Sequence, residues 1–125
     1  MTVARRRTGE IAEELVARRL AAKGWEIVER NARTRYGELD IVARDGRTLV
    51  FIEVKGGRES TRLGPEKPIL SIDLRKQRRV RRLATAWMSE RRGRPPYDEI
   101  RFDAVGVSLD RTGRAVHVDY VKGAF

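Results

Sequence analysis

The feature that most constrains this chain is a concentration of charge on a predicted β-hairpin at residues 37–55. Two runs rich in Val, Ile, Leu and Phe flank the dipeptide Asp45-Gly46. Both residues of that dipeptide tolerate the positive φ of a type I′ turn, and the flanking residues favour strands. With this dipeptide as the loop, Glu38 would lie opposite Glu53. The hairpin is therefore expected to place like charges directly across from each other.

Side chains two apart on a strand share a face, so four ionisable residues are expected to project together from the hairpin. They are Glu38, Asp40, Glu53 and Lys55. Two carboxylates about 5 Å apart repel by about 3 kcal/mol at an effective dielectric constant of about 20. A bound cation would relieve this repulsion, and the alternative is a solvated face with Lys55 in an ordinary cross-strand ion pair. The apolar run at residues 49–52 favours the cation, because such a run is typical of a central strand covered on both faces.

The charge composition of the chain limits the kinds of binding partner that it suits. The chain has 125 residues, enough for one domain, with 28 Lys and Arg against 18 Asp and Glu and a net charge of +10. Such an excess favours a polyanion such as nucleic acid, most simply DNA. An anionic membrane surface is the competing interpretation, but no basic helix carries the Trp/Phe/Leu face that this mode needs. Without a spanning segment or a secretion signal, we expect a cytoplasmic protein that does not enter membranes.

The residue composition also limits which metal ions the chain could bind. There is no cysteine, and His117 is the only histidine. Thiolate sites and sites built on several imidazoles are therefore excluded. Oxygen ligands remain, and they point to Mg²⁺ or Mn²⁺ as the cofactor.

The order of predicted elements indicates an α/β domain with a mixed sheet of about five strands flanked by two main helices. Residues 1–125 form this single domain, and residues 1–7 are expected to be a disordered basic tail. The first helix is expected to run from a cap at Thr8 to a stop at Gly24. The other expected elements are a strand at 25–30, a polar connection at 31–36, the hairpin as the rest of a three-stranded meander, a surface loop at 58–68 after a stop at Gly56-Gly57, a helix from a cap at Ser71 to about Arg92, and strands at 100–109 and 115–121.

The second helix combines an apolar stripe with a basic surface. Val80, Leu83, Ala84 and Trp87 have the spacing of a buried helix face. One turn earlier this stripe reaches Lys76, which we expect to point inward. The residues expected to bind nucleic-acid phosphates are Arg58, Arg75, Lys76, Arg79 and Arg82. A solvated charged face is the alternative, but such a face normally mixes both signs.

Three further features have alternative interpretations. Glu10 lies in the first helical turn, where the helix dipole alone favours a carboxylate, or it lies at the mouth of the acidic face. The loop at 58–68 is a connector or a lid over substrate. We interpret Asp103, in the strand at 100–109, as a structural residue paired with an arginine.

The spacing Asp-x12-Glu-x-Lys at Asp40, Glu53 and Lys55 resembles the motif of the restriction-endonuclease-like superfamily, written PD-(D/E)XK. Leu39 stands where that motif has proline. A wider set of positions resembles the YraN-like family of bacterial proteins, which is itself similar to archaeal Holliday-junction resolvases. This set comprises Gly9-Glu10, Asn31, residues 37–40, residues 51–55, Lys76 and residues 101–103. The family continues after the lysine with Thr or Val and then Arg, whereas here Gly56-Gly57 precede Arg58.

The resemblance implies metal-dependent hydrolysis of phosphodiester bonds. Asp40 and Glu53, with the carbonyl of Val54, would hold Mg²⁺ or Mn²⁺, and Lys55 would position or help deprotonate the attacking water. Glu38 and Glu10 would reach the metal through water or a second ion.

Three functions remain open from sequence. They are a nuclease acting on branched or damaged DNA, a nucleic-acid-binding protein that uses the same fold without hydrolysis, and a component of a larger complex with an acidic partner. A homodimer would suit a resolvase-like enzyme that cuts two strands symmetrically.

Overall fold

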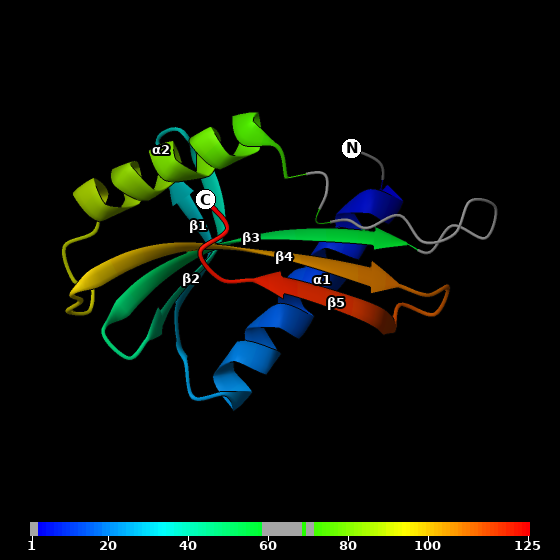
Figure 1. Ribbon diagram of the computed structural model, residues 1–125. Helices are drawn as coiled ribbons and strands as arrows, with labels where there is room; N and C mark the ends of the chain where they lie inside the picture. Colours follow the sequence, from blue (N-terminus) through cyan, green and yellow to red (C-terminus); the bar gives the residue numbers. More distant parts are fainter. Residues whose placement is uncertain (1–2, 59–68, 70–71) are drawn as a thin grey trace.

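The fold is built on a mixed sheet of five strands in the order β1-β2-β3-β4-β5, with β3 at its centre (Figure 1). Neighbouring strands are antiparallel except β3 and β4, which are parallel. The strands are β1 (Glu26–Thr34), β2 (Gly37–Asp45), β3 (Thr48–Arg58), β4 (Glu99–Leu109) and β5 (Ala115–Val121). The predicted α/β class, the mixed sheet and the central position of the Phe51 strand are confirmed.

The computed structural model describes residues 3–58, 69 and 72–125, with side chains from residue 6 onward. The loop at 59–68, expected as a connector or lid, and the expected cap Ser71 lie outside the described residues. Neither helix in the described ranges has the length and apolarity needed to cross a bilayer.

Helix α1 (Val3–Ala22) covers one face of the sheet. Its apolar side chains pack with Ile41, Val50 and Ile52 in a core cluster. Gly24, with a φ of 90°, ends the helix as predicted. The helix begins at Val3 and not after a cap at Thr8, so residues 3–7 are helical where we expected a disordered tail.

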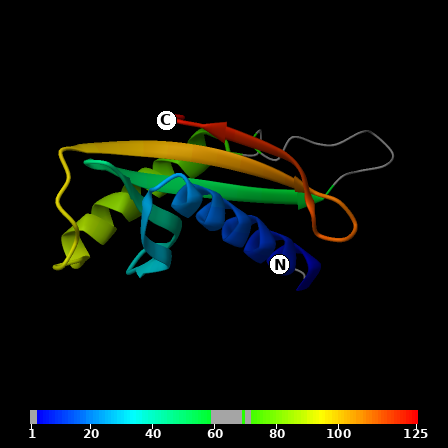
Figure 2. The same cartoon turned by 90° about the horizontal axis from the view of Figure 1, so that it is seen from below.

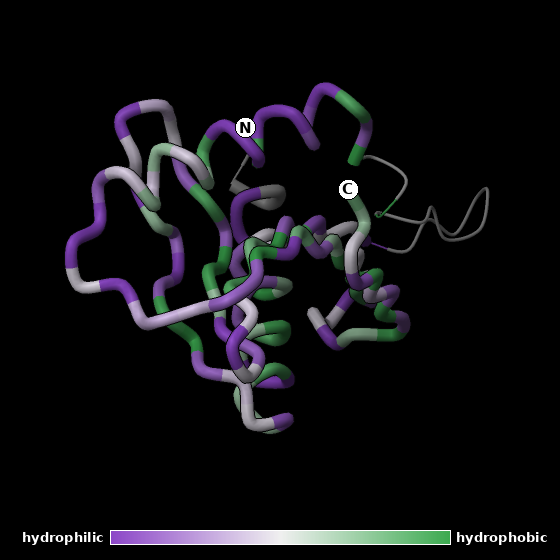
Figure 3. Tube along the Cα trace, turned by 60° about the vertical axis from the view of Figure 1, so that its left-hand side comes forward, coloured by the Kyte–Doolittle hydropathy of each residue, from purple (hydrophilic) through white to green (hydrophobic). Residues whose placement is uncertain are grey.

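Helix α2 (Leu74–Glu90) covers the opposite face, as the two views of the ribbon show (Figures 1 and 2). The predicted stripe is buried, and it packs on Val42, Leu49 and Phe51. The cap is Asp73, whose side chain accepts a hydrogen bond from the Lys76 amide. The helix therefore begins after Asp73, beyond the expected cap. Hydrophilic colour predominates along α2 in Figure 3, in keeping with its basic outer surface.

The hairpin register differs from the prediction by two residues. Asp45 pairs with Thr48, so the loop is Gly46-Arg47. Gly46 has a φ of 61°, and Arg47 does not have a positive φ. A glycine at the first loop position is typical of a type II′ turn. The predicted opposition of Glu38 and Glu53 is wrong, yet a shift of two residues keeps every side chain on its predicted face.

Two strands are longer than predicted. Strand β1 continues to Thr34, through most of the expected polar connection. Strand β3 continues through Gly56-Gly57 to Arg58. The close approach of α1 explains the glycine at position 56, where a Cβ atom would lie 3.0 Å from the Thr8 carbonyl oxygen.

Asp103 is structural, as predicted. It is fully buried on β4 and accepts hydrogen bonds from Arg101 at 2.8 Å and 3.0 Å. The Tyr120 hydroxyl and the Gly123 amide also donate to it. These contacts tie β4 to β5 and to the C-terminal turn.

Candidate functional site

Asp40 and Glu53 meet where strands β2 and β3 separate. The last regular pair of this ladder joins Ile41 to Ile52. Beyond it, the Val54 amide donates to the Asp40 Oδ2 atom at 2.8 Å, so a carboxylate replaces the backbone acceptor. Continuing the observed register places Asp40 opposite Glu53. The charge of Asp40 acts directly on Glu53 at this fork.

The pKa values of both carboxyl groups in this pair are raised. Burial raises the pKa of Glu53 above its ordinary value, and the neighbouring Asp40 raises it further. Burial also raises the pKa of Asp40, although the hydrogen bond from the Val54 amide opposes the change. Neighbouring carboxylates repel, and a cation placed beside them favours their ionised forms. A cation bound at the fork would therefore stabilise the ionised pair.

Glu13 on α1 is a third carboxyl group at this site, and sequence reasoning missed it. Burial, and then the charge of Asp40, raises the pKa of Glu13 to about 7. Its Oε1 atom is buried and has no hydrogen-bond partner in the described part of the chain. The helical spacing could have indicated this position, because Glu13 precedes the buried Val16 and Ala17 by three and four residues and so lies on the same helix face.

The predicted residues Glu10 and Glu38 are exposed. Burial is the main cause of the raised pKa of Asp40, and the negative charge of Glu38 raises it further. Glu10 lies one turn before Glu13 and lines a groove between α1 and the β4–β5 turn. That groove is also lined by Arg6, Arg7, Arg18, Arg19, Arg30 and Arg114. Glu10 is not in the first turn of the helix, because α1 begins at Val3 and its first turn has no acidic residue.

Lys55 follows Glu53 by two residues on β3 and lies on the same face of the strand. It is exposed and forms no hydrogen bond or ion pair with any described residue. Its lateral neighbour on β4 is Gly106. Ile69 lies so close above Gly106 that a Cβ there would be 2.6 Å from the Ile69 amide nitrogen. The backbone at Ile69 therefore borders the side of β3 from which the exposed Lys55 projects.

Arg79 is the cation of α2 that acts on both carboxyl groups. It opposes the rise in pKa of Asp40 and Glu53 that burial causes, and Lys76 does the same for Glu53 alone. The Arg79 Nη2 atom lies 2.9 Å from the position a Cβ would take at Gly37. Gly37 has a φ of 140°, which also favours glycine. The sequence predicted Lys76 as the innermost basic residue, whereas Arg79 faces both members of the pair.

The other predicted phosphate-binding residues lie in different parts of the fold. Arg75 is exposed on the first turn of α2. The Arg82 guanidinium carbon lies 4.9 Å from the centre of the Tyr36 ring, beside the β1–β2 turn. Arg58 donates instead to the Thr8 hydroxyl at 3.1 Å and to the Asp110 carbonyl, on the side of α1. Arg58 is thus apart from the basic surface of α2.

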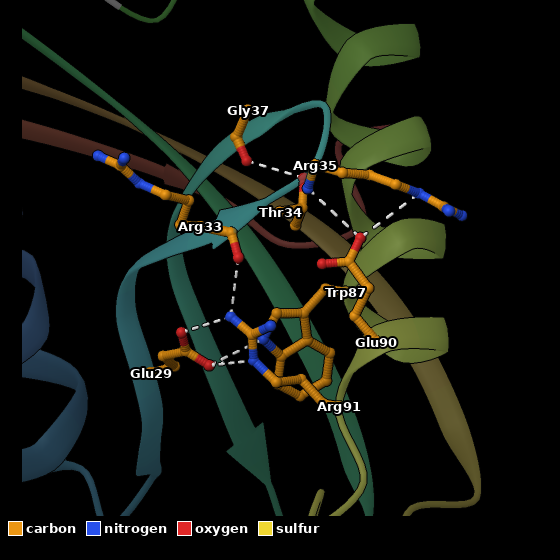
Figure 4. A network of polar contacts seen from close by, with 8 residues as sticks. All are labelled: Glu29, Arg33, Thr34, Arg35, Gly37, Trp87, Glu90 and Arg91. Carbon is orange, nitrogen blue, oxygen red and sulfur yellow. Dashed lines mark hydrogen bonds and ion pairs between the residues drawn. The ribbon is translucent and has the colours of Figure 1, made fainter.

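A polar network fixes the β1–β2 turn against the C-terminal half of α2 (Figure 4). Glu29 accepts from both Arg91 and the Trp87 indole, and Arg91 also donates to the Arg33 carbonyl. The Arg35 amide donates to Glu90. These contacts hold the turn, and with it the start of β2, in a fixed position relative to the basic helix.

The donor chemistry at the fork fits an oxygen-preferring divalent cation. The available ligands are the Asp40 and Glu53 carboxylates and the Val54 carbonyl, and the orphaned Glu13 oxygen faces the same charge. Among the described residues there is no group of three or more His, Cys, Asp or Glu side chains placed to hold one metal ion. Mg²⁺ is usually held by one or two carboxylates together with water and substrate oxygens, so a pair is a sufficient protein contribution.

A family model and several individual proteins match this chain, and all of them belong to one family. The family model, described as "Uncharacterised protein family UPF0102", matches residues 12–107. A UPF0102 protein of Moorella thermoacetica is 45% identical over 127 residues, covering 100% of both chains. One from Streptomyces griseus is 47% identical over 120 residues, covering 96% of this chain and 97% of the relative. One from Nocardia farcinica is 45% identical over 117 residues, covering 94% of this chain and 87% of the relative.

Proposed function

The chain belongs to the UPF0102 or YraN-like family, as its sequence indicated, and we propose that it is a metal-dependent nuclease that hydrolyses phosphodiester bonds of DNA. One observation carries the proposal. A half-buried carboxyl pair at a strand fork has the carboxyl group of Glu13, from α1, close enough for its pKa to be raised by Asp40, and the cations of a basic helix near it. The spacing of Asp40, Glu53 and Lys55 supports the proposal through its resemblance to the PD-(D/E)XK motif.

The roles of the residues follow from their chemistry. Asp40 and Glu53, with the Val54 carbonyl, would hold Mg²⁺ or Mn²⁺ through their ionised carboxylates. A bound cation of this kind polarises a phosphoryl oxygen and lowers the pKa of water. Lys55 positions the attacking water and offsets charge on the phosphate, while Arg79 and Lys76 bind the backbone next to the site. Glu13 accepts a hydrogen bond from water near the pair.

A second candidate function is nucleic-acid binding without hydrolysis. The outer side of α2 supports it, because Arg75, Arg78 and Arg79 are exposed there and can bind phosphates without a metal ion. The basic surface of α2 serves both functions equally. Log affinity for DNA should then fall with log salt concentration, with a slope of about 0.9 for each phosphate neutralised.

The decisive experiment is a cleavage assay with Mg²⁺ or Mn²⁺ over single-stranded, duplex, flap and four-way-junction DNA. We expect Glu53→Ala and Lys55→Ala each to reduce the rate about a hundredfold or more, because each removes charge stabilisation at the reacting phosphate. Glu99→Ala, which removes an exposed carboxylate from β4, is the matched control and should cleave like wild type.

Equal cleavage by wild type and both site variants would identify a contaminating nuclease and reject the proposal. No cleavage of any substrate, combined with DNA binding that EDTA does not change, would establish the second function instead. A homodimer and a cytoplasmic location remain predictions that this assay does not address.

A further inference from the structure

Tyr36 is an exposed aromatic residue with no role in the core. It lies in the turn between β1 and β2, and it is 51% exposed. The other large exposed apolar side chains of the described residues are aliphatic. Of the other aromatic rings that contact arginines, Trp25 and Trp87 are buried, and Tyr97 and Phe102 are half-buried. A large ring kept at the surface in this way needs an explanation other than packing.

Two guanidinium groups accompany this ring. The central carbons of Arg35 and Arg82 lie 5.1 Å and 4.9 Å from the ring centre. These distances are typical of cation–π contacts. An exposed ring beside arginines is the combination that proteins use to stack an unpaired base and neutralise its phosphate.

The position of the ring connects it to the carboxyl pair. A Cβ added at its neighbour Gly37 would lie 2.9 Å from the Arg79 Nη2 atom, and Arg79 acts electrostatically on Asp40 and Glu53. Tyr36 therefore stands at the border of the proposed catalytic site. A nucleotide stacked on the ring would belong to the same strand segment whose phosphate reaches the pair.

The turn is rigid without help from the ring. The Thr34 hydroxyl accepts from the Tyr36 amide at 3.1 Å and donates to the Gly37 carbonyl at 2.8 Å. The Arg35 amide and the Arg91 side chain anchor the turn to α2 and to β1 (Figure 4). Holding the turn in place therefore does not account for the exposed ring, and preorganisation lowers the entropic cost of binding.

We propose that Tyr36, flanked by Arg35 and Arg82, is a stacking site for an unpaired base of the substrate DNA. This inference rests on the proposed function and specifies its substrate as DNA with unpaired nucleotides next to the cleaved bond. Bases inside a regular duplex already stack on their neighbours and are not available to the ring. The site therefore selects single-stranded, flap or junction DNA over blunt duplex.

The test measures binding in EDTA, so that it does not depend on cleavage. Fluorescence of 2-aminopurine, placed in a short single strand, in a flap and in a blunt duplex of the same sequence, reports stacking and affinity together. For Tyr36→Leu we expect affinity for the single strand and the flap to fall about tenfold, with loss of the quenching that stacking causes. Affinity for the duplex should change by less than about twofold. Tyr36→Phe keeps the ring and should behave like wild type.

Arg75→Ala is the control, because it removes an exposed charge from the first turn of α2, two helical turns before Arg82. It should weaken binding to all three DNAs by the same factor. The proposal is overturned if Tyr36→Leu weakens all three equally or none, or if Tyr36→Phe behaves like Tyr36→Leu. Failure of the cleavage assay would reject hydrolysis and leave this result unaffected, whereas loss of strand discrimination bears on the stacking site alone.

Discussion

Glu53→Gln should stabilise the free protein above neutral pH while abolishing its response to divalent cations. Burial and the charge of Asp40 raise the pKa of Glu53 from 4.5 to about 8. The folded protein thus holds this proton to a higher pH than the unfolded chain does. The resulting stability is complete below about pH 4.5 and is lost as the pH rises towards about 8. Glutamine has the same shape, can donate to Asp40 and does not titrate, so it should avoid the loss.

The magnitude follows from the two pKa values. Each pH unit between them corresponds to about 1.4 kcal/mol, so the whole interval corresponds to about 5 kcal/mol. The pair is half-buried, and screening by solvent reduces this to about 2–3 kcal/mol. We therefore expect Glu53→Gln to exceed wild type by about 2–3 kcal/mol in free energy of unfolding at about pH 8.5, and to match it near pH 5.

Urea denaturation followed by tryptophan fluorescence measures this difference, because Trp25 and Trp87 are both buried. Glu99→Gln, which makes the same substitution at an exposed position, should follow the pH dependence of wild type. The reasoning is refuted if Glu53→Gln loses stability between about pH 5 and 8.5 as steeply as wild type does.

Two other substitutions test separate parts of the structure. Glu13→Gln should reduce Mg²⁺-dependent cleavage about tenfold or more, because the loss of a group that supports a metal site has an effect of this size. Glu10→Gln should reduce cleavage less than about threefold. Equal effects of the two substitutions would contradict the placement of Glu13. Gly106→Ala should lower the free energy of unfolding by about 1–3 kcal/mol in urea denaturation, since the added Cβ meets the Ile69 backbone. Gly9→Ala meets no atom within 4 Å inside α1 and should raise it by about 0.5–1 kcal/mol, so a loss of stability there would refute this account of the glycines.

Predictions that depended on periodicity succeeded because short-range geometry decides them. The stripe on α2 is buried as predicted, since residues three and four apart share a helix face in any fold. Asp40 and Glu53 share a face of the hairpin for the comparable reason that side chains alternate along a strand. A register error of two residues left that result intact.

Predictions failed where two nearby residues suit the local structure equally well and contacts with another helix or strand decide between them. Asp45-Gly46 and Gly46-Arg47 are both acceptable loops locally, and the ladder with β3 selects the second. Glu13 on α1 was not singled out at all, because only the docking of α1 on the sheet brings its carboxyl group within the influence of Asp40. The start of α2 was misplaced for a similar reason, because Asp73 and Ser71 are equally good caps in isolation.

The sequence by itself determined that a carboxyl pair and a lysine lie on one face of a hairpin, because strand alternation and spacing leave no other arrangement. It also determined the oxygen-only chemistry of any metal and the basic character of α2, because these depend on composition alone. Only the tertiary structure decided that β2 and β3 separate at Asp40, and that Glu13 and Arg79 approach the fork from opposite helices. Such contacts join residues far apart in the chain, and packing, not local propensity, sets them.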